Sequence, residues 1–248
     1  MKHFSKLTFM VTGLLLSVFI FQSCLDKDDN IDIYYPNALV TVKHAPDNTF
    51  YLQLNAKTTL LPTNVDKSPY GDKEVRALVN YMEVDKESKE YTKAVHINWI
   101  DSILTKQTVP FLEAEDFDTV YGTDPVEIVN DWVTIAEDSY LTLRFRTRWG
   151  YTQKPHFVNL ITGVNEDNPY EIEFRHNAYG DTFGNSGDAL VAFSLKDLPD
   201  TNGETVKLKL TWMSFSGKKS TEFDYRTDEE TKGNLVLKND NNFIQAIE

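Results

Sequence analysis

Two histidines are the first candidates for chemistry in this sequence. His156 and His176 lie at the ends of predicted strands that could be neighbours, and Asp181 could supply a third ligand to a metal ion. Imidazole nitrogens and a carboxylate oxygen are ligands that zinc accepts. Alternatively, His176 and Asn177 hydrogen-bond a loop at the end of their strand. We expect this structural role and no bound metal.

The segment at residues 179–188 carries oxygen atoms of the kind that calcium binds, from Asp181, Asn185 and Asp188. Its spacing matches no EF-hand loop, and it lacks the bidentate glutamate of such loops. Asparagine and glycine also suit tight turns with positive φ. We therefore expect a structural loop and no cofactor.

Three arginines, Arg144, Arg146 and Arg148, lie on one face of a predicted strand. In an acidic protein, such a stripe could bind an anionic ligand. Glu171 and Glu173 face outward on another predicted strand, and charge pairing across strands would also explain the stripe. We expect pairing and retain the three arginines as a candidate ligand-binding site.

Exposed aromatic rings in the N-terminal half could stack on sugars, since small β-barrels are known to bind oligosaccharides. Tyr51 points away from its neighbours Phe50 and Leu52, which alternate with it along a predicted strand. Tyr51 is therefore the best candidate for an exposed, ligand-binding ring.

Sequence motifs of catalysis are absent. The sequence contains no His-Glu-x-x-His, P-loop or Gly-x-Gly-x-x-Gly pattern. Residues 184–187 read Gly-Asn-Ser-Gly, but a nucleophile elbow needs its second glycine one position later. No serine is accompanied by an identifiable base and orienting acid. We therefore predict a protein that is not an enzyme.

The N-terminus reads as an export signal. Two lysines precede an apolar stretch at residues 7–21, which as a helix would cover about 22 Å, less than a roughly 30 Å hydrocarbon core. The only cysteine, Cys24, follows directly after Ser23. This arrangement resembles a bacterial lipoprotein box, which implies that residues 1–23 are a signal peptide and that Cys24 carries lipid. An ordinary cleavage site beside a chance cysteine is the alternative.

An acidic tether is predicted at residues 24–35. Asp26, Lys27, Asp28 and Asp29 resemble the surface-export signal of Bacteroidetes lipoproteins. The resemblance implies a protein held in the outer membrane by its N-terminal lipid and displayed on the cell surface. The alternative is a merely solvated spacer, because such runs stay disordered.

Composition narrows the class of protein further. The chain has 248 residues and a net charge of -13, so the phosphates of nucleic acids would be repelled. Aromatic residues make up 12% of the chain, which excludes a wholly disordered protein. With one cysteine, no intramolecular disulfide can form.

Period-2 alternation of apolar and polar residues predicts an all-β protein with two domains. Five short strands predict a small barrel of the oligonucleotide/oligosaccharide-binding (OB) type at residues 36–108, although an SH3-like barrel has the same periodicity. Residues 109–125 look like an acidic linker between the domains, or the start of the second domain. Seven or eight strands at residues 126–248 predict an immunoglobulin-like antiparallel β-sandwich. The predicted strands are 38–43, 50–54, 58–61, 75–84, 94–104, 131–136, 140–149, 157–164, 170–176, 189–195, 205–215, 221–225 and 235–237.

Several segments of the second half resemble one known family. They are residues 131–134, 139–145, 156–160, 175–181 and 191–195. Together they resemble the NigD-like lipoproteins of Bacteroides and Prevotella. The resemblance implies an N-terminal OB domain, a C-terminal β-sandwich and no catalytic activity.

We therefore predict a non-catalytic binding lipoprotein of the cell envelope, whose ligand is a glycan or another envelope protein. Self-protection at a bacteriocin locus, an immunity-type function, is the alternative that the family resemblance implies. An envelope hydrolase that uses two of the 38 acidic residues is a further alternative. So is a purely structural envelope protein.

Overall fold

The computed structural model describes residues 36, 38–150, 154–227 and 243–248. The predicted signal peptide, Cys24, the export signal at residues 26–29 and the strand at 235–237 lie outside these residues. In the part of the chain that is described, no helix is long and apolar enough to cross a membrane.

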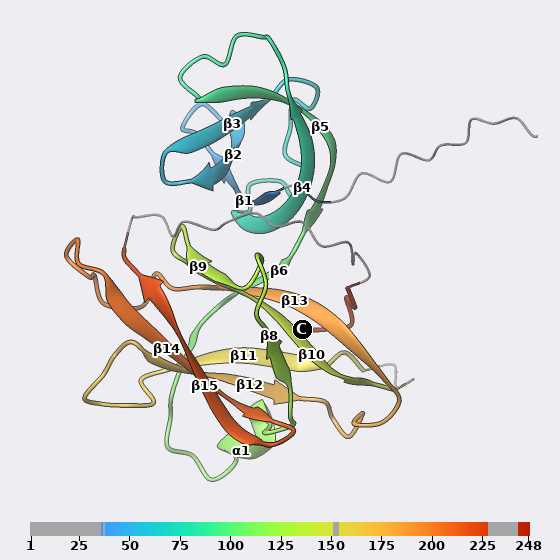
Figure 1. The fold of residues 1–248 in the computed structure, drawn as a ribbon, viewed down its shortest axis with the longest axis vertical. Helices are drawn as coiled ribbons and strands as arrows, with labels where there is room; N and C mark the ends of the chain where they lie inside the picture. The colour runs from blue at the N-terminus through green and yellow to red at the C-terminus, as the bar shows by residue number, and fades with distance from the viewer. Residues whose placement is uncertain (1–35, 37, 151–153, 228–242) are drawn as a thin grey trace, which may run out of the picture. The chain divides into compact units, whose positions relative to one another are not determined.

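The N-terminal half forms a closed, OB-like barrel of five strands, as predicted (Figure 1). Around the barrel the strands follow the order β1, β2, β3, β5 and β4, and β4 pairs with β1 to close it. Every second side chain faces inward. The core includes Val40, Val42, Leu52, Leu60 and Val79, all fully buried. The strands are β1 Ala38–His44, β2 Phe50–Asn55, β3 Thr58–Pro62, β4 Val75–Glu83 and β5 Lys93–Ser102.

The second half is a sandwich of two sheets, as predicted (Figure 1). One sheet has the order β6, β13, β10 and β8, with β9 also paired to β10; the other has the order β15, β14, β12, β11 and β7. Their bounds are β6 Leu104–Gln107, β7 Val109–Pro110, β8 Glu127–Val129, β9 Ile135–Glu137, β10 Tyr140–Trp149, β11 Phe157–Thr162, β12 Glu171–Asn177, β13 Asn185–Ser194, β14 Val206–Ser214 and β15 Gly217–Tyr225.

Three phenylalanines from both sheets meet in the core of the sandwich. The ring centroid of Phe174 lies 5.3 Å from that of Phe145 and 6.1 Å from that of Phe193. The sheets are not purely antiparallel: β6 pairs with β13, β7 with β11, and β12 with β14 in parallel. Two of these parallel pairs arise because β6 and β7 join strands that come much later in the chain. The third arises because β13, which lies between β12 and β14 in the sequence, belongs to the other sheet.

The stretch at residues 109–125 differs from the acidic linker that its composition suggested, because it is built into the sandwich. It contains β7 and the short helix α1, Phe117–Tyr121. Phe117 is buried, and its ring lies 5.0 Å from Phe111 and 4.7 Å from Tyr121. Burial of Phe117 and stacking of Tyr121 on Phe157 of β11, with ring centroids 6.2 Å apart, hold the stretch on the sandwich despite its acidic residues.

The barrel and the sandwich belong to the same compact unit. Leu39 and Leu78 of the barrel pack in one hydrophobic cluster with Val133 and Leu190 of the sandwich domain. Beside this cluster lies Arg76 of β4, whose guanidinium is fully buried.

Arg76 bonds to both domains. Its guanidinium donates to the hydroxyl of Thr41 in β1 at 2.9 Å and to that of Thr142 in β10 at 3.3 Å. It also forms an ion pair with Glu137 of β9 at 2.5 Å. A buried charge needs such partners, so Arg76 ties the two domains together.

Candidate functional site

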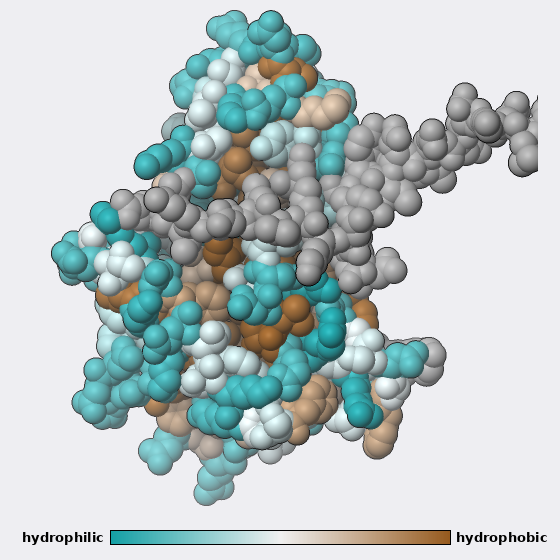
Figure 2. Space-filling view, viewed as in Figure 1, coloured by the Kyte–Doolittle hydropathy of each residue, from teal (hydrophilic) through white to brown (hydrophobic). Residues whose placement is uncertain are grey.

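Exposed apolar side chains do not single out one binding face. The visible face is mostly hydrophilic (Figure 2). Large exposed hydrophobic residues are spread over distant elements, for example Met82 in the barrel and Leu112, Phe183 and Phe215 in the sandwich domain. Apolar residues exposed singly are normal in soluble proteins.

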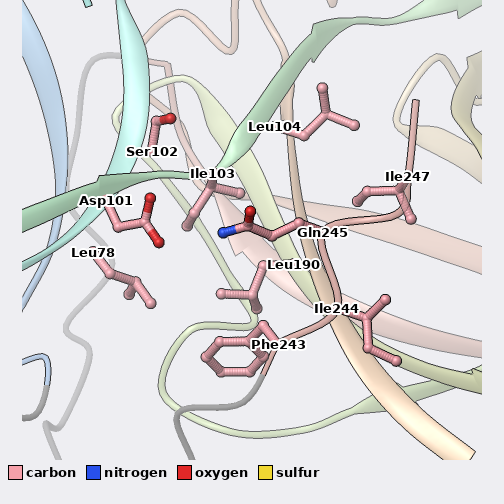
Figure 3. Close-up of a pocket in the computed structure, with 10 residues that line it drawn as sticks. All are labelled: Leu78, Asp101, Ser102, Ile103, Leu104, Leu190, Phe243, Ile244, Gln245 and Ile247. Carbon is pink, nitrogen blue, oxygen red and sulfur yellow. The ribbon is translucent and has the colours of Figure 1, made fainter. Parts of the chain in front are cut away.

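A cavity of about 270 Å³ between the barrel and the sandwich is the better candidate site (Figure 3). It lies where β5 ends and β6 begins, next to β13 and to the segment Phe243–Glu248. We call this segment the closing segment. The lining residues are Leu78, Asp101, Ser102, Ile103, Leu104, Leu190, Phe243, Ile244, Gln245 and Ile247.

The walls of the cavity are mostly aliphatic, with one aromatic ring, that of Phe243, and its polar groups are few. In Figure 3 the carboxylate of Asp101 and the amide of Gln245 point toward one another across the space, above Leu78 and Leu190. Asp101, Ser102 and Gln245 are exposed at the rim. The cavity could hold an apolar group whose polar end donates a hydrogen bond to Asp101. The ten lining residues include no histidine, lysine or arginine.

The arginine stripe pairs with other acids than expected. Arg144 contacts Asp188 at 2.7 Å and Asp131 at 2.8 Å, and Arg146 contacts Asp188 at 2.5 Å. Burial alone would raise the pKa of Asp188, but the hydrogen bonds from Arg146 and Arg144 lower it below its usual value. Arg148 is exposed on the same strand.

The expected partners, Glu171 and Glu173, lie on β12 in the other sheet. Glu171 pairs there with Lys209 at 3.1 Å, and Glu173 with Arg175 at 2.7 Å. The expectation that the arginines form charge pairs was right for Arg144 and Arg146, but the expected partners were wrong. Strand β10 pairs with β13 and not with β12, and the sequence alone did not reveal this pairing.

Tyr51 is only partly buried, but its ring has an aromatic neighbour. The ring centroid lies 5.1 Å from that of Tyr91, which is buried. Tyr51 stands on β2 in the barrel and the arginines stand on β10 in the sandwich. The structure therefore does not bring these predicted ligand-binding residues into one site.

The two histidines and Asp181 do meet, as a buried chain of hydrogen bonds. His156 Nδ1 lies 2.9 Å from His176 Nε2, and His156 Nε2 lies 3.4 Å from Asp181 Oδ2. His176 Nδ1 donates to the carbonyl oxygen of Asp124 at 3.3 Å. The indole of Trp149 stacks on His156. The three side chains do not converge on one point, and among the described residues no set of acids, histidines or cysteines is placed to hold a metal ion.

Burial disfavours the charged form of both histidines. It lowers the pKa of His176 to about 4 and also lowers the pKa of His156. Asn177 donates to the carbonyl oxygens of Thr119 and Val120 at 3.0 and 3.1 Å. His176 and Asn177 thus hold loops at the end of β12, in agreement with their expected structural role.

Sequence reasoning missed the cavity altogether. Its lining comes from β4, β5, β6, β13 and the closing segment, and each residue reads locally as core or turn. The one usable signal was the apolar spacing of Phe243, Ile244 and Ile247 after a polar stretch.

The two domains match two family models. Residues 39–103 match the NigD-like N-terminal OB domain, and residues 107–225 match the NigD-like C-terminal beta sandwich domain. No curated protein matches the chain.

Solved structures show the same fold. A protein of Parabacteroides distasonis described as toxin related is 38% identical with a TM-score of 0.65, covering 77% of this chain and 93% of that one. A NigD-like immunity protein of Bacteroides caccae is 18% identical with a TM-score of 0.56, covering 78% and 99%. A protein of Bacteroides fragilis described as a lipoprotein is 11% identical with a TM-score of 0.51, covering 77% and 98%. The chain therefore belongs to the NigD-like family, with an N-terminal OB domain and a C-terminal β-sandwich.

Proposed function

We propose that this protein is a non-catalytic binding protein of the cell envelope and that it uses the cavity between its barrel and its sandwich. The cavity is the observation that carries the proposal. Concave, mostly apolar sites with a few inward polar groups, placed between domains, are typical ligand sites. The mostly aliphatic walls, in which Phe243 is the single aromatic lining residue, favour an apolar side chain of a protein ligand over a glycan, because sugars are usually held by several aromatic faces and polar groups.

Lipid on Cys24 would hold the protein at the outer membrane, on the cell surface. The lone cysteine after an apolar stretch supports this anchor. So does the lipoprotein description of the structural neighbour from Bacteroides fragilis.

Cys24→Ala is expected to leave an uncleaved or mislocalised precursor, because the thiol that accepts the lipid is gone. Electrophoretic mobility and membrane fractionation of the expressed chain measure this. Normal processing and membrane retention of the variant would contradict lipidation.

An immunity-type function is the second candidate. The toxin-related and immunity descriptions of two neighbours favour it. In that case the bound partner would be a toxin, and cells that produce the toxin but lack this protein would be sensitive to the toxin. A binding protein without this role would leave sensitivity unchanged.

Blocking the cavity should abolish binding. Ser102 lies at the rim, so Ser102→Trp places an indole over the mouth. For any envelope protein or glycan that binds the wild type in a thermal-shift panel, we expect at least about tenfold weaker binding, which is about 1.4 kcal/mol. Ser220→Trp, at an exposed site on β15, is the matched control and should bind normally. Equal binding by both variants would remove the cavity from the proposal.

A further inference from the structure

The closing segment completes an edge of both sheets of the sandwich. The N–H of Ile244 donates to the carbonyl oxygen of Asp188 in β13 at 2.7 Å. Two residues later the segment reaches β11. There the N–H of His156 donates to the carbonyl oxygen of Ala246 at 2.9 Å, and the N–H of Glu248 donates to the carbonyl oxygen of His156 at 2.8 Å.

These edges are free for a strand because their regular partners are short. On β13, β6 pairs only with Val191–Ser194. On β11, β7 pairs only with Ile161 and Thr162. Asp188, His156 and Val158 lie beyond these pairings. Unpaired edge groups of this kind are templates for an added strand.

The closing segment lies in a groove along these two sheet edges, next to Asp188, His156 and Val158. The side-chain sockets of this groove fit branched apolar residues. Ile244 and Ile247 are partly buried and pack against the core of the sandwich. Gly187 leaves room for Ile244, because a Cβ at this position would overlap the Ile244 Cδ1 atom. Trp149 donates to the carbonyl oxygen of Gly187 at 2.9 Å and forms the wall of the socket.

Charged groups flank the two ends of the groove. The guanidinium of Arg144 lies 5.2 Å from the ring centroid of Phe243. At the other end, Lys106 donates to the carbonyl oxygen of Val158 at 2.8 Å, and the charge of Glu248 acts on it. An acidic side chain after the second isoleucine therefore fits the groove.

We propose that this groove is a binding site for a peptide segment that bonds to β13 and then, after a turn, to the edge of β11, and that the closing segment occupies it as an intramolecular ligand. The ligand is a strand of a partner protein with two branched apolar residues three positions apart and an acidic residue after the second. Main-chain bonds to a sheet edge give such sites affinity, and side-chain pockets give specificity.

The contacts of the closing segment are those of an exchangeable ligand. Within the described residues, four backbone hydrogen bonds join it to the sandwich, and every one of its side chains is at least partly exposed. Its covalent link to the rest of the chain favours it over a free peptide of equal affinity, because its binding is intramolecular. A partner strand with better contacts would displace it. This proposal goes beyond the proposed function. Because Phe243, Ile244, Gln245 and Ile247 also line the cavity, displacement of the closing segment would open one wall of it.

The test is binding of a fluorescent hexapeptide, Phe-Ile-Gln-Ala-Ile-Glu, to the full-length chain by anisotropy. The double variant Ile244→Asp/Ile247→Asp empties the groove, so it should bind the peptide at least about tenfold tighter than the wild type does. Met82→Asp/Leu112→Asp adds the same charges at exposed sites and should behave like the wild type. A peptide with both isoleucines replaced by aspartate should bind none of the three.

Gly187→Val in the emptied background should abolish peptide binding, because its side chain fills the Ile244 socket. Melting temperatures check that each variant folds. As a measurement without any substitution, a peptide with a photoreactive group in place of the second isoleucine should label the wild-type chain near His156.

Equal binding to wild type and emptied variant, no binding to either, or labelling elsewhere would overturn the proposal. A wild-type dimer that disappears in the emptied variant would also overturn it, because the groove would then exchange segments between two copies of this chain.

Discussion

Replacing Arg76 with alanine is expected to lower the free energy of unfolding by about 3–5 kcal/mol, because it removes the charge partner of a largely buried carboxylate. The side chain of Glu137 is 11% exposed and would lose the guanidinium that pairs with it. The hydroxyls of Thr41 and Thr142 would each lose a hydrogen-bond donor. Urea unfolding followed by tryptophan fluorescence measures the change.

Arg148→Ala removes the same charge from an exposed site on β10 and is the matched control. It should change stability by less than about 0.5 kcal/mol. The double variant Arg76→Met/Glu137→Gln should regain part of the loss, since no unpaired charge remains buried. A loss below about 1 kcal/mol for Arg76→Ala would show that the buried pair does not tie the domains together.

Gly122→Ala should be the second most damaging change, with a loss of about 3 kcal/mol or more from backbone strain and overpacking combined. Gly122 ends α1 with φ of 74° and ψ of 166°, a region almost restricted to glycine. An added Cβ would also overlap the carbonyl oxygen of His176 and the Cα of Asn177.

Gly71 separates the two causes. It also has a positive φ, of 63°, but no atom lies within 4 Å of where its Cβ would be. Gly71→Ala should therefore cost only the conformational part, about 1 kcal/mol. Equal losses for the two variants in chemical denaturation would mean that the contact with β12 is unimportant.

Much of the strand pattern could be predicted from alternation alone. The strand predicted at residues 75–84 corresponds to β4, Val75–Glu83, and the strand predicted at residues 157–164 corresponds to β11, Phe157–Thr162. Both strands bury several apolar residues, among them Val79 in β4 and Leu160 in β11, so the local pattern and the fold agree. A single strand was predicted at 94–104, but the chain turns at Ile103 and continues as β6 in the sandwich. Local periodicity carries no sign of this change of domain.

Pairing between distant strands could not be predicted from the sequence. The arginines of β10 were expected to pair with Glu171 and Glu173, but Asp188 is the residue that β13 places opposite Arg146. Likewise, the acidic residues at 109–125 indicated a linker, and the burial of Phe117 outweighs their charge. In both cases strand order and tertiary packing decide, and neither is encoded in a short window.

The position of the closing segment along the chain affects what can happen to the protein while it is being synthesised. A chain is synthesised from its N-terminus, so β11 and β13 leave the ribosome before Phe243 does. Until then, the edges at His156 and Asp188 have no strand to bond. During this interval two emerging copies could pair through these edges and aggregate. A chain cut between β15 and Phe243 would keep this hazard permanently, even though every strand of both sheets were present.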